Sequence, residues 1–370
     1  MIISKIIYFV TISLTLLLFS LVPRVKCDKG FILGNLLKVF VSSFIVTYPL
    51  FLLLASRYDI GTDYENYEKL YTYYIQSGIT GFEPFFASLF WVGDNYNLNF
   101  DSFIVFTSFI CIVIPFGYIK NSFPKKDVFL AVFTLIVLLF GSWFNIIRQC
   151  TAMGIILIAI HYLIERKIIG YLFFILLASL CHSSSLVLLP CVFFIRIFNK
   201  SMSKVKVIKH LFFLGIICIL LVFLYLRFGA NLAYYDHVAG EEADGITSKW
   251  FLIFSAFLYV PEFLLLKYIL KEDNKYSILY ALLILEFTCY LFGLYMNLGY
   301  RIGQLFSLVH VYLLPRVVCC AQRHKIKFIK PYIYSLLVVL FYFTTFIAKY
   351  NGVYNYKYKI SIFKELFPII

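Results

Sequence analysis

Charged side chains are scarce in this chain of 370 residues: Asp, Glu, Lys and Arg make up 14% of it, whereas apolar types make up 62%. The mean hydropathy is +0.89, and apolar runs long enough to cross a bilayer recur along the sequence. This composition excludes a soluble domain. Because lipid offers no partner to a backbone polar group, the runs must be helices. We predict an all-α fold, a polytopic integral membrane helical bundle that forms a single domain over residues 1–370.

Acidic residues are fewer than basic ones, 19 against 33, which leaves a formal net charge of +14. The excess does not indicate a nucleic-acid partner, because the basic residues gather in short loops where they set topology and meet anionic lipid. The nine cysteines form no CxxC pair, and we find no histidine at metal-ligand spacing from them. They are typical of small core side chains rather than of disulfides or metal ligands. We therefore expect no metal and no cofactor.

About ten to twelve apolar segments are expected to be membrane helices. The first resembles a signal peptide, but it lacks a small-residue cleavage site and is followed by further spans, so we treat it as the first span. The candidate segments are residues 5–22, 31–55, 102–119, 128–144, 147–164, 169–197, 209–227, 250–270, 277–296, 302–320 and 329–348.

Residues 169–197 are predicted to form a re-entrant hairpin rather than a span. If they crossed the membrane once, the basic loop 196–209 would lie outside and the acidic loop 228–249 inside, against the positive-inside rule. Two half-length helices that break near His182, each roughly 20 Å long, remove both violations. The alternative is one long tilted helix together with a miscounted span elsewhere.

Residues 56–101 are predicted to be a loop on the outer face, because they carry seven acids against Arg57 and Lys69. Charge is concentrated at its start, where Arg57, Asp59 and Asp63 lie close together. A polar ligand would explain this cluster, and an ordinary solvated loop is the competing interpretation. Tyrosines such as Tyr64 come directly after this cluster. They are typical either of a site that stacks on sugars or of an aromatic belt at the membrane interface.

Two arginines, Arg148 and Arg301, interrupt apolar sequence at the predicted outer ends of membrane spans. An arginine at the membrane edge is costly unless it faces a cavity or a partner. A guanidinium binds phosphate oxygens bidentately and keeps its proton, so the pair suits a diphosphate ligand. The competing interpretation is that each snorkels to the interface or pairs with an acid of the outer loop.

His182 lies between an apolar run and three serines. An imidazole there could accept a proton from an attacking sugar hydroxyl or steady a phosphate, whereas a structural histidine bonded to a helix carbonyl is the alternative. Glu262 and Glu286 are also costly inside apolar segments. They suit either counter-ions for an arginine or a proton relay, and both alternatives stay open. The other histidines, His310 and His324 among them, are assigned no chemistry.

Four elements in order resemble the EpsG-type family of polysaccharide polymerases, relatives of the Wzy O-antigen polymerases. They are Arg57-Tyr-Asp-Ile-Gly-Thr-Asp63-Tyr-x-x-Tyr67, Glu83-Pro84, Arg148-Gln-x-x-Ala152 and His182-Ser-Ser-Ser-Leu. The resemblance is detailed between residues 50 and 200 and extends, through Arg301 and the general layout, to most of the chain.

The resemblance implies polymerisation of undecaprenyl-diphosphate-linked oligosaccharide repeat units at the periplasmic, outer face of a multi-pass protein of the bacterial plasma (inner) membrane. The product would be O-antigen, capsule or exopolysaccharide. The implied partners are the lipid-linked oligosaccharide as donor and acceptor, membrane lipid and, in some systems, a chain-length regulator. The catalytic candidates are then His182, Asp63 and Arg148, and the substrate-binding candidates are Arg57, Asp59, Tyr64, Glu83 and Arg301.

Three other functions fit parts of the pattern. A lipid-linked oligosaccharide flippase handles the same lipid, but it should carry pseudo-repeats and charges buried along a central passage. A membrane acyltransferase acting on sugars would need a catalytic histidine on the side of its acyl donor. A glycosyltransferase that uses a polyprenyl-phosphate sugar is closest in chemistry.

Overall fold

The computed structural model describes residues 2–25, 32–61, 63–198, 202–228, 245–294 and 297–347. Throughout these ranges the regular secondary structure is helical and includes no strand, which confirms the all-α prediction. The contacts divide the chain into two compact units. Unit 1 comprises Met1–Ile158, Leu176–Ser183 and Phe341–Ile370, and unit 2 comprises Ala159–Ile175 and Ser184–Leu340.

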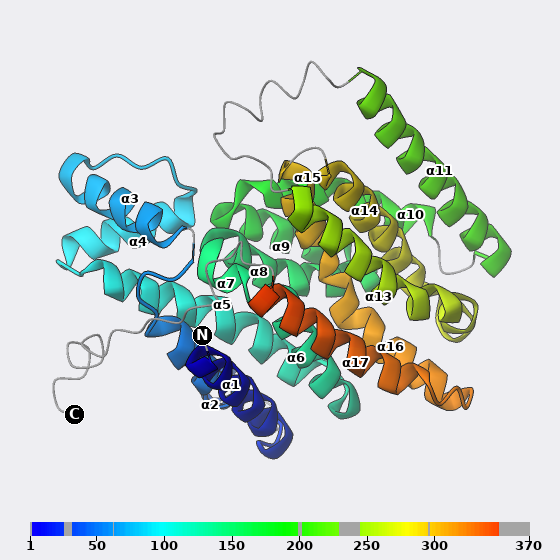
Figure 1. The fold of residues 1–370 in the computed structure, drawn as a ribbon, viewed down its shortest axis with the longest axis horizontal. Coiled ribbons are helices and arrows are strands. Elements are labelled where there is room, and N and C mark those ends of the chain that lie inside the picture. Colours follow the sequence, from blue (N-terminus) through cyan, green and yellow to red (C-terminus); the bar gives the residue numbers. More distant parts are fainter. Residues whose placement is uncertain are drawn as a thin grey trace. The chain divides into compact units, whose positions relative to one another are not determined.

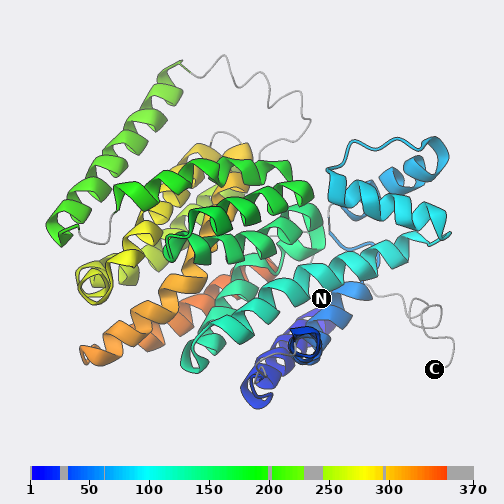
Figure 2. The ribbon, with the colours of Figure 1, turned by 180° about the vertical axis from the view of Figure 1, so that it is seen from behind.

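Unit 1 is built on three apolar helices, α1 (Ile2–Leu21), α2 (Ile32–Ala55) and α5 (Phe100–Ser122), of which α2 packs against both others (Figure 1). Two shorter helices, α3 (Tyr64–Ser77) and α4 (Pro84–Asn95), lie beside the start of α5, as the view from behind also shows (Figure 2). This helical pair forms most of the predicted outer-face loop, 56–101.

Local sequence explains where these helices begin and end. Gly78, with φ of 70°, ends α3 in the left-handed conformation that glycine adopts most easily. Extended backbone at Glu83 and a proline at the first helical position start α4. The Asn99 side chain accepts the Ser102 backbone N–H and caps α5.

The predicted span 128–144 is shorter than expected. Helix α6 (Lys125–Leu139) ends early, and a single-turn helix, α7 (Ser142–Asn145), follows it. Ile146, with φ of −88° and ψ of 60°, then breaks the helix before α8 (Ile147–Ile164) begins. The break matters because the second residue of α8 is Arg148.

Residues 168–197 fold back on themselves, as the predicted hairpin requires. Helix α9 (Ile168–Cys181) is followed by a 3₁₀ helix, η1 (Ser183–Phe193), and by α10 (Phe194–Ile197). The Tyr171 hydroxyl donates to the Leu188 carbonyl, and Arg166 donates to the Ile195 carbonyl at 3.1 Å. The two arms are therefore antiparallel, and their break falls at His182.

Unit 2 contains the remaining helices. They are α11 (Lys204–Phe228), α13 (Gly245–Glu272), η3 (Asn274–Tyr276), α14 (Ser277–Gly293), α15 (Asn297–Ser307), α16 (Val309–Arg323) and most of α17 (Ile329–Tyr342), which precedes η4 (Phe343–Ile347). Helices α14 and α15 pack closely through glycines: a Cβ added at Gly299 would lie 2.5 Å from the Gly293 nitrogen. Small residues allow helices this close approach in membranes.

By length and apolar composition, five stretches of the described residues are long enough to cross a membrane. They are Ser4–Leu21, Leu37–Ala55, Phe100–Ser122, Ile147–Ile164 and Asn274–Gly293. Helices α15 and α16, bent by 43°, add a sixth span if they are counted as one. The chain is thus a multi-pass helical membrane protein, but the expected ten to twelve spans are not confirmed, because several predicted segments form shorter or broken helices.

Candidate functional site

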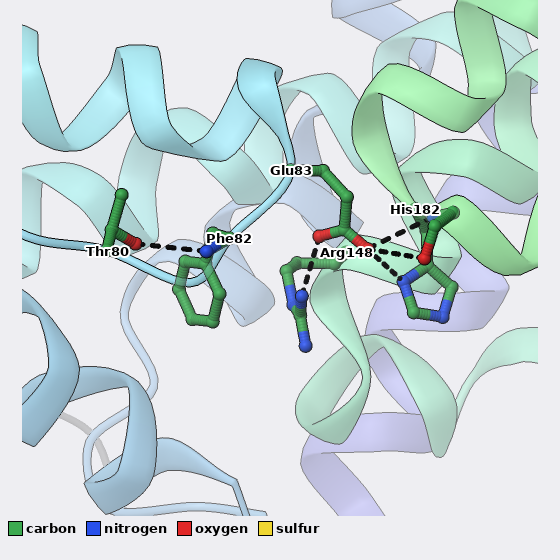
Figure 3. Close-up of polar contacts among 6 residues, drawn as sticks. Thr80, Phe82, Glu83, Arg148 and His182 are labelled. Carbon is green, nitrogen blue, oxygen red and sulfur yellow. Dashed lines mark hydrogen bonds and ion pairs between the residues drawn. The ribbon is translucent and has the colours of Figure 1, made fainter.

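The site is organised around the carboxylate of Glu83, in the residue that immediately precedes α4 (Figure 3). Its Oε2 accepts a hydrogen bond of 2.6 Å from Nη1 of Arg148. Its Oε1 lies 3.0 Å from Nδ1 of His182 and accepts the Ser183 backbone N–H at 3.0 Å. The Glu83 side chain is only 12% exposed. One carboxylate of unit 1 therefore joins the start of α8 to the tip of the hairpin.

The electrostatics of Glu83 follow from these contacts. Burial alone would raise the pKa of its carboxyl, but the Ser183 N–H and the Arg148 guanidinium lower it from 4.5 to about 2. Glu83 is therefore ionised at any physiological pH and can only accept hydrogen bonds. Nδ1 of His182 must then carry the proton, which leaves Nε2 as the basic nitrogen of the neutral ring.

Arg148 is held from two sides. Its guanidinium carbon lies 4.3 Å from the centre of the Phe82 ring, and Phe82 is ordered by a hydrogen bond from its N–H to the Thr80 hydroxyl (Figure 3). The Nε of Arg148 is buried and has no hydrogen-bond partner. Buried donors are rarely left unpaired, so this nitrogen is available to an oxygen of a ligand.

Tyr67 connects Asp63 to the same cluster. Asp63 is the N-cap residue of α3, and its carbonyl accepts the Tyr67 N–H at 3.0 Å. Burial raises the pKa of the Tyr67 hydroxyl to about 12, although the charge of Arg148 opposes this and that of Asp63 adds to it. The hydroxyl keeps its proton and can donate a hydrogen bond.

Arg57 is buried rather than exposed to a ligand. It is 1% exposed, and its Nη1 donates to the Trp143 carbonyl at 2.5 Å. Gly61, with φ of 96°, lies against the same turn: an added Cβ would meet the Phe144 carbonyl oxygen at 2.3 Å. The 57–61 segment thus packs on the turn that leads into Arg148.

The three other predicted residues differ in their burial. Asp59 is partly buried and has φ of 49°. Tyr64 is buried, and its ring packs edge-on against Phe100 at 5.3 Å. Arg301 is an exposed residue of α15 in unit 2. Of the eight candidates, the structure joins Glu83, Arg148 and His182 directly, and the shared site with Arg301 stays a prediction.

Comparison with known protein families supports the resemblance in the motifs. The model of the EpsG family matches residues 40–358, nearly the whole chain and every residue of the cluster described above. The chain belongs to the EpsG family. No curated protein and no solved structure matches it. Membership of the EpsG family makes the chain a membrane protein of polysaccharide polymerisation, a glycosyltransferase-like activity.

A second polar cluster in this EpsG-family chain lies inside unit 2 and was only partly expected. Nδ1 of His310 lies 2.7 Å from Glu262, and its Nε2 lies 3.1 Å from Glu286; all three side chains are at most 1% exposed. The ring of Tyr259 stacks on His310 at 5.6 Å. The two glutamates therefore have a histidine, rather than an arginine, as their partner. Sequence reasoning overlooked His310 because its partners lie on two other helices, Tyr259 and Glu262 on α13 and Glu286 on α14.

Proposed function

We propose that the chain polymerises undecaprenyl-diphosphate-linked oligosaccharide repeat units at the outer face of a bacterial plasma membrane. The observation that carries this proposal is Glu83, whose carboxylate holds both Arg148 and His182. A glycosyl transfer from a diphosphate requires a base for the acceptor hydroxyl and a cation for the leaving group, and these two residues supply them.

In the proposed reaction, the anomeric C–O bond between the growing chain and its lipid diphosphate breaks. The diphosphate leaves with the electron pair, and the anomeric carbon bonds to a hydroxyl oxygen of a second lipid-linked unit. His182 accepts the hydroxyl proton at Nε2, while Glu83 fixes the ring through Nδ1, as a carboxylate does in a catalytic triad. Arg148 donates to the departing diphosphate, for which its buried Nε is available.

Other residues take supporting roles in this scheme. Asp63 orients the acceptor beside the Tyr67 hydroxyl, and Arg57 holds the turn that carries Arg148 in place. Arg301 supplies a second cation for the diphosphate, and Asp59 and Tyr64 contribute to the sugar-binding region. The lipid-linked unit is both donor and acceptor, and a chain-length regulator is a further proposed partner.

The direct test is reconstitution of the purified protein with a synthetic undecaprenyl-diphosphate oligosaccharide, followed by separation of products by length. Glu83→Gln and His182→Ala should each abolish the ladder of multimers. Glu65→Gln is the matched control, because Glu65 is exposed and pairs with Lys69 on the same helix. Full-length ladders from both site variants would overturn the proposal. A product formed only from an undecaprenyl-phosphate sugar or an acyl donor would instead identify one of the other transferases.

One observation favours a flippase as a second candidate. The Glu262–His310–Glu286 cluster places ionisable groups inside the helices of unit 2, as a transporter requires. The two functions differ in what a loss-of-function variant accumulates in cells. A polymerase variant displays single repeat units on the outside, whereas a flippase variant retains lipid-linked units on the inside.

A further inference from the structure

A third cluster lies where α13 and α16 end in unit 2. Cys320 and His324 are four residues apart, at the end of α16 and just after it, and Glu272 is the last residue of α13. One ligand atom from each side chain lies within 4.8 Å of the other two. Sequence reasoning overlooked the four-residue spacing between Cys320 and His324. Glu272 is remote from both in the chain, so only the fold brings it to them.

We propose that Glu272, Cys320 and His324 bind one zinc ion. Thiolate, imidazole and carboxylate are the donors that zinc prefers, and a spacing of four residues presents two of them on the same face of a helix. Tetrahedral zinc with bonds of about 2.0 to 2.3 Å needs donor atoms roughly 3.5 Å apart. The side chains would move together by about 1 Å on binding, which the exposed Glu272 and His324 allow.

The neighbouring residues are compatible with such a site. The His324 ring packs on Tyr268, with centroids 4.5 Å apart, which limits its orientations. Glu272 now pairs with Arg323 at 2.8 Å, but Arg323 is 54% exposed and such a pair contributes little. Zinc would replace the guanidinium as the counter-ion of Glu272. Three protein ligands leave the fourth position to water or to a partner molecule.

The predicted topology gives the thiol a suitable environment. The basic segments 267–275 and 316–330 are expected on the cytoplasmic side, where cysteines stay reduced. A zinc ion there would join α13 to α16, the helices that also carry Glu262 and His310. Bound zinc would make unit 2 more stable. This proposal does not depend on the reaction proposed above.

The test uses the full chain, purified in detergent with a tag that contains no histidine. Cobalt(II) serves as the spectroscopic probe, because a cobalt–thiolate bond produces a charge-transfer band that other ligands do not. We expect one equivalent of cobalt to produce the band and zinc to displace it. Cys320→Ser should remove the band, and His324→Gln and Glu272→Gln should weaken binding by about tenfold or more.

Cys319→Ser is the matched control, because Cys319 is also buried on α16 but does not belong to the cluster. It should keep the band and the rise in unfolding temperature that zinc produces in the unaltered protein. Arg323→Gln releases Glu272 and should tighten binding. The proposal is overturned if the band is absent, if it survives in Cys320→Ser, or if Cys319→Ser removes it as well.

Discussion

Glu83 accepts a hydrogen bond of 2.6 Å from Arg148, a residue 65 positions later in the chain. The pair connects the loop before α4 to the first turn of α8. Without Glu83, the Arg148 guanidinium would lie at the membrane edge without a carboxylate partner. The same carboxylate reaches His182, 99 positions away. A single acid thus orients the two groups that a glycosyl transfer from a diphosphate requires.

Gly61→Ala should disrupt the site, because the new Cβ would overlap the Phe144 carbonyl oxygen and push away the turn before Arg148. We expect a strong loss of polymer in cells that depend on the variant. Gly78→Ala is the matched control: it also has positive φ, but an added Cβ meets nothing within 4 Å. That change should cost only about 1 kcal/mol of stability. Equal polymer from the two variants would refute the role of Gly61.

The contribution of Glu83 to stability should be lost only in acid. Its pKa is lowered on folding, so its stabilisation is complete above the ordinary value of 4.5 and disappears as pH falls towards about 2. The difference in unfolding temperature between the unaltered protein and Glu83→Gln should therefore stay constant from about pH 6 to 8 and shrink below about pH 4.5. A difference that changes between pH 6 and 8 would show that Glu83 titrates there.

Arg148→Ala should abolish polymer while the protein remains in the membrane, and cells should then display single repeat units. Arg148→Lys should retain partial activity, because a point charge replaces a guanidinium that binds two oxygens at once. We expect the same pattern for Arg301. Immunoblots of the surface polysaccharide measure the ladder, and membrane fractions measure the protein. A normal ladder from either alanine variant removes that residue from diphosphate binding.

His310→Ala should destabilise the protein by about 3–5 kcal/mol, because it leaves the buried carboxylates of Glu262 and Glu286 without their partner. His210→Ala is the control, since His210 is exposed on α11. Thermal unfolding in detergent compares the two variants. If both unfold at the temperature of the unaltered protein, the cluster contributes no net stability.

The hairpin at His182 predicts a topology that labelling can measure. Single cysteines at Ser203 and Ala243, in a protein without native cysteines, should be labelled from the inside and the outside respectively. Ala243 lies outside the described residues. The reverse pattern would mean that 169–197 crosses the membrane once.

Sequence reasoning was most successful where a single residue conflicted with its surroundings. Arg148 and His182 stood out because a cation at a membrane edge and an imidazole within apolar sequence are costly, and both belong to the cluster. The break at His182 was predicted because the charges of the flanking loops required it. The count of ten to twelve spans is not confirmed, because apolar composition does not reveal the turn at Ile146 or the 3₁₀ helix after His182.

The sequence itself determined membrane insertion and the helical class, and it showed which polar residues are costly in their surroundings. Each of these follows from local hydrophobicity and from the need to pair backbone groups in lipid. The central place of Glu83 was decided only by tertiary structure. Locally, Glu83 before Pro84 indicates no more than a helix start. Glu83 contacts Arg148 and His182 only because the fold brings distant segments together, and the same holds for His310 with Glu262 and Glu286. Such segments meet only after the chain has closed long loops, and no local pattern encodes the pairing.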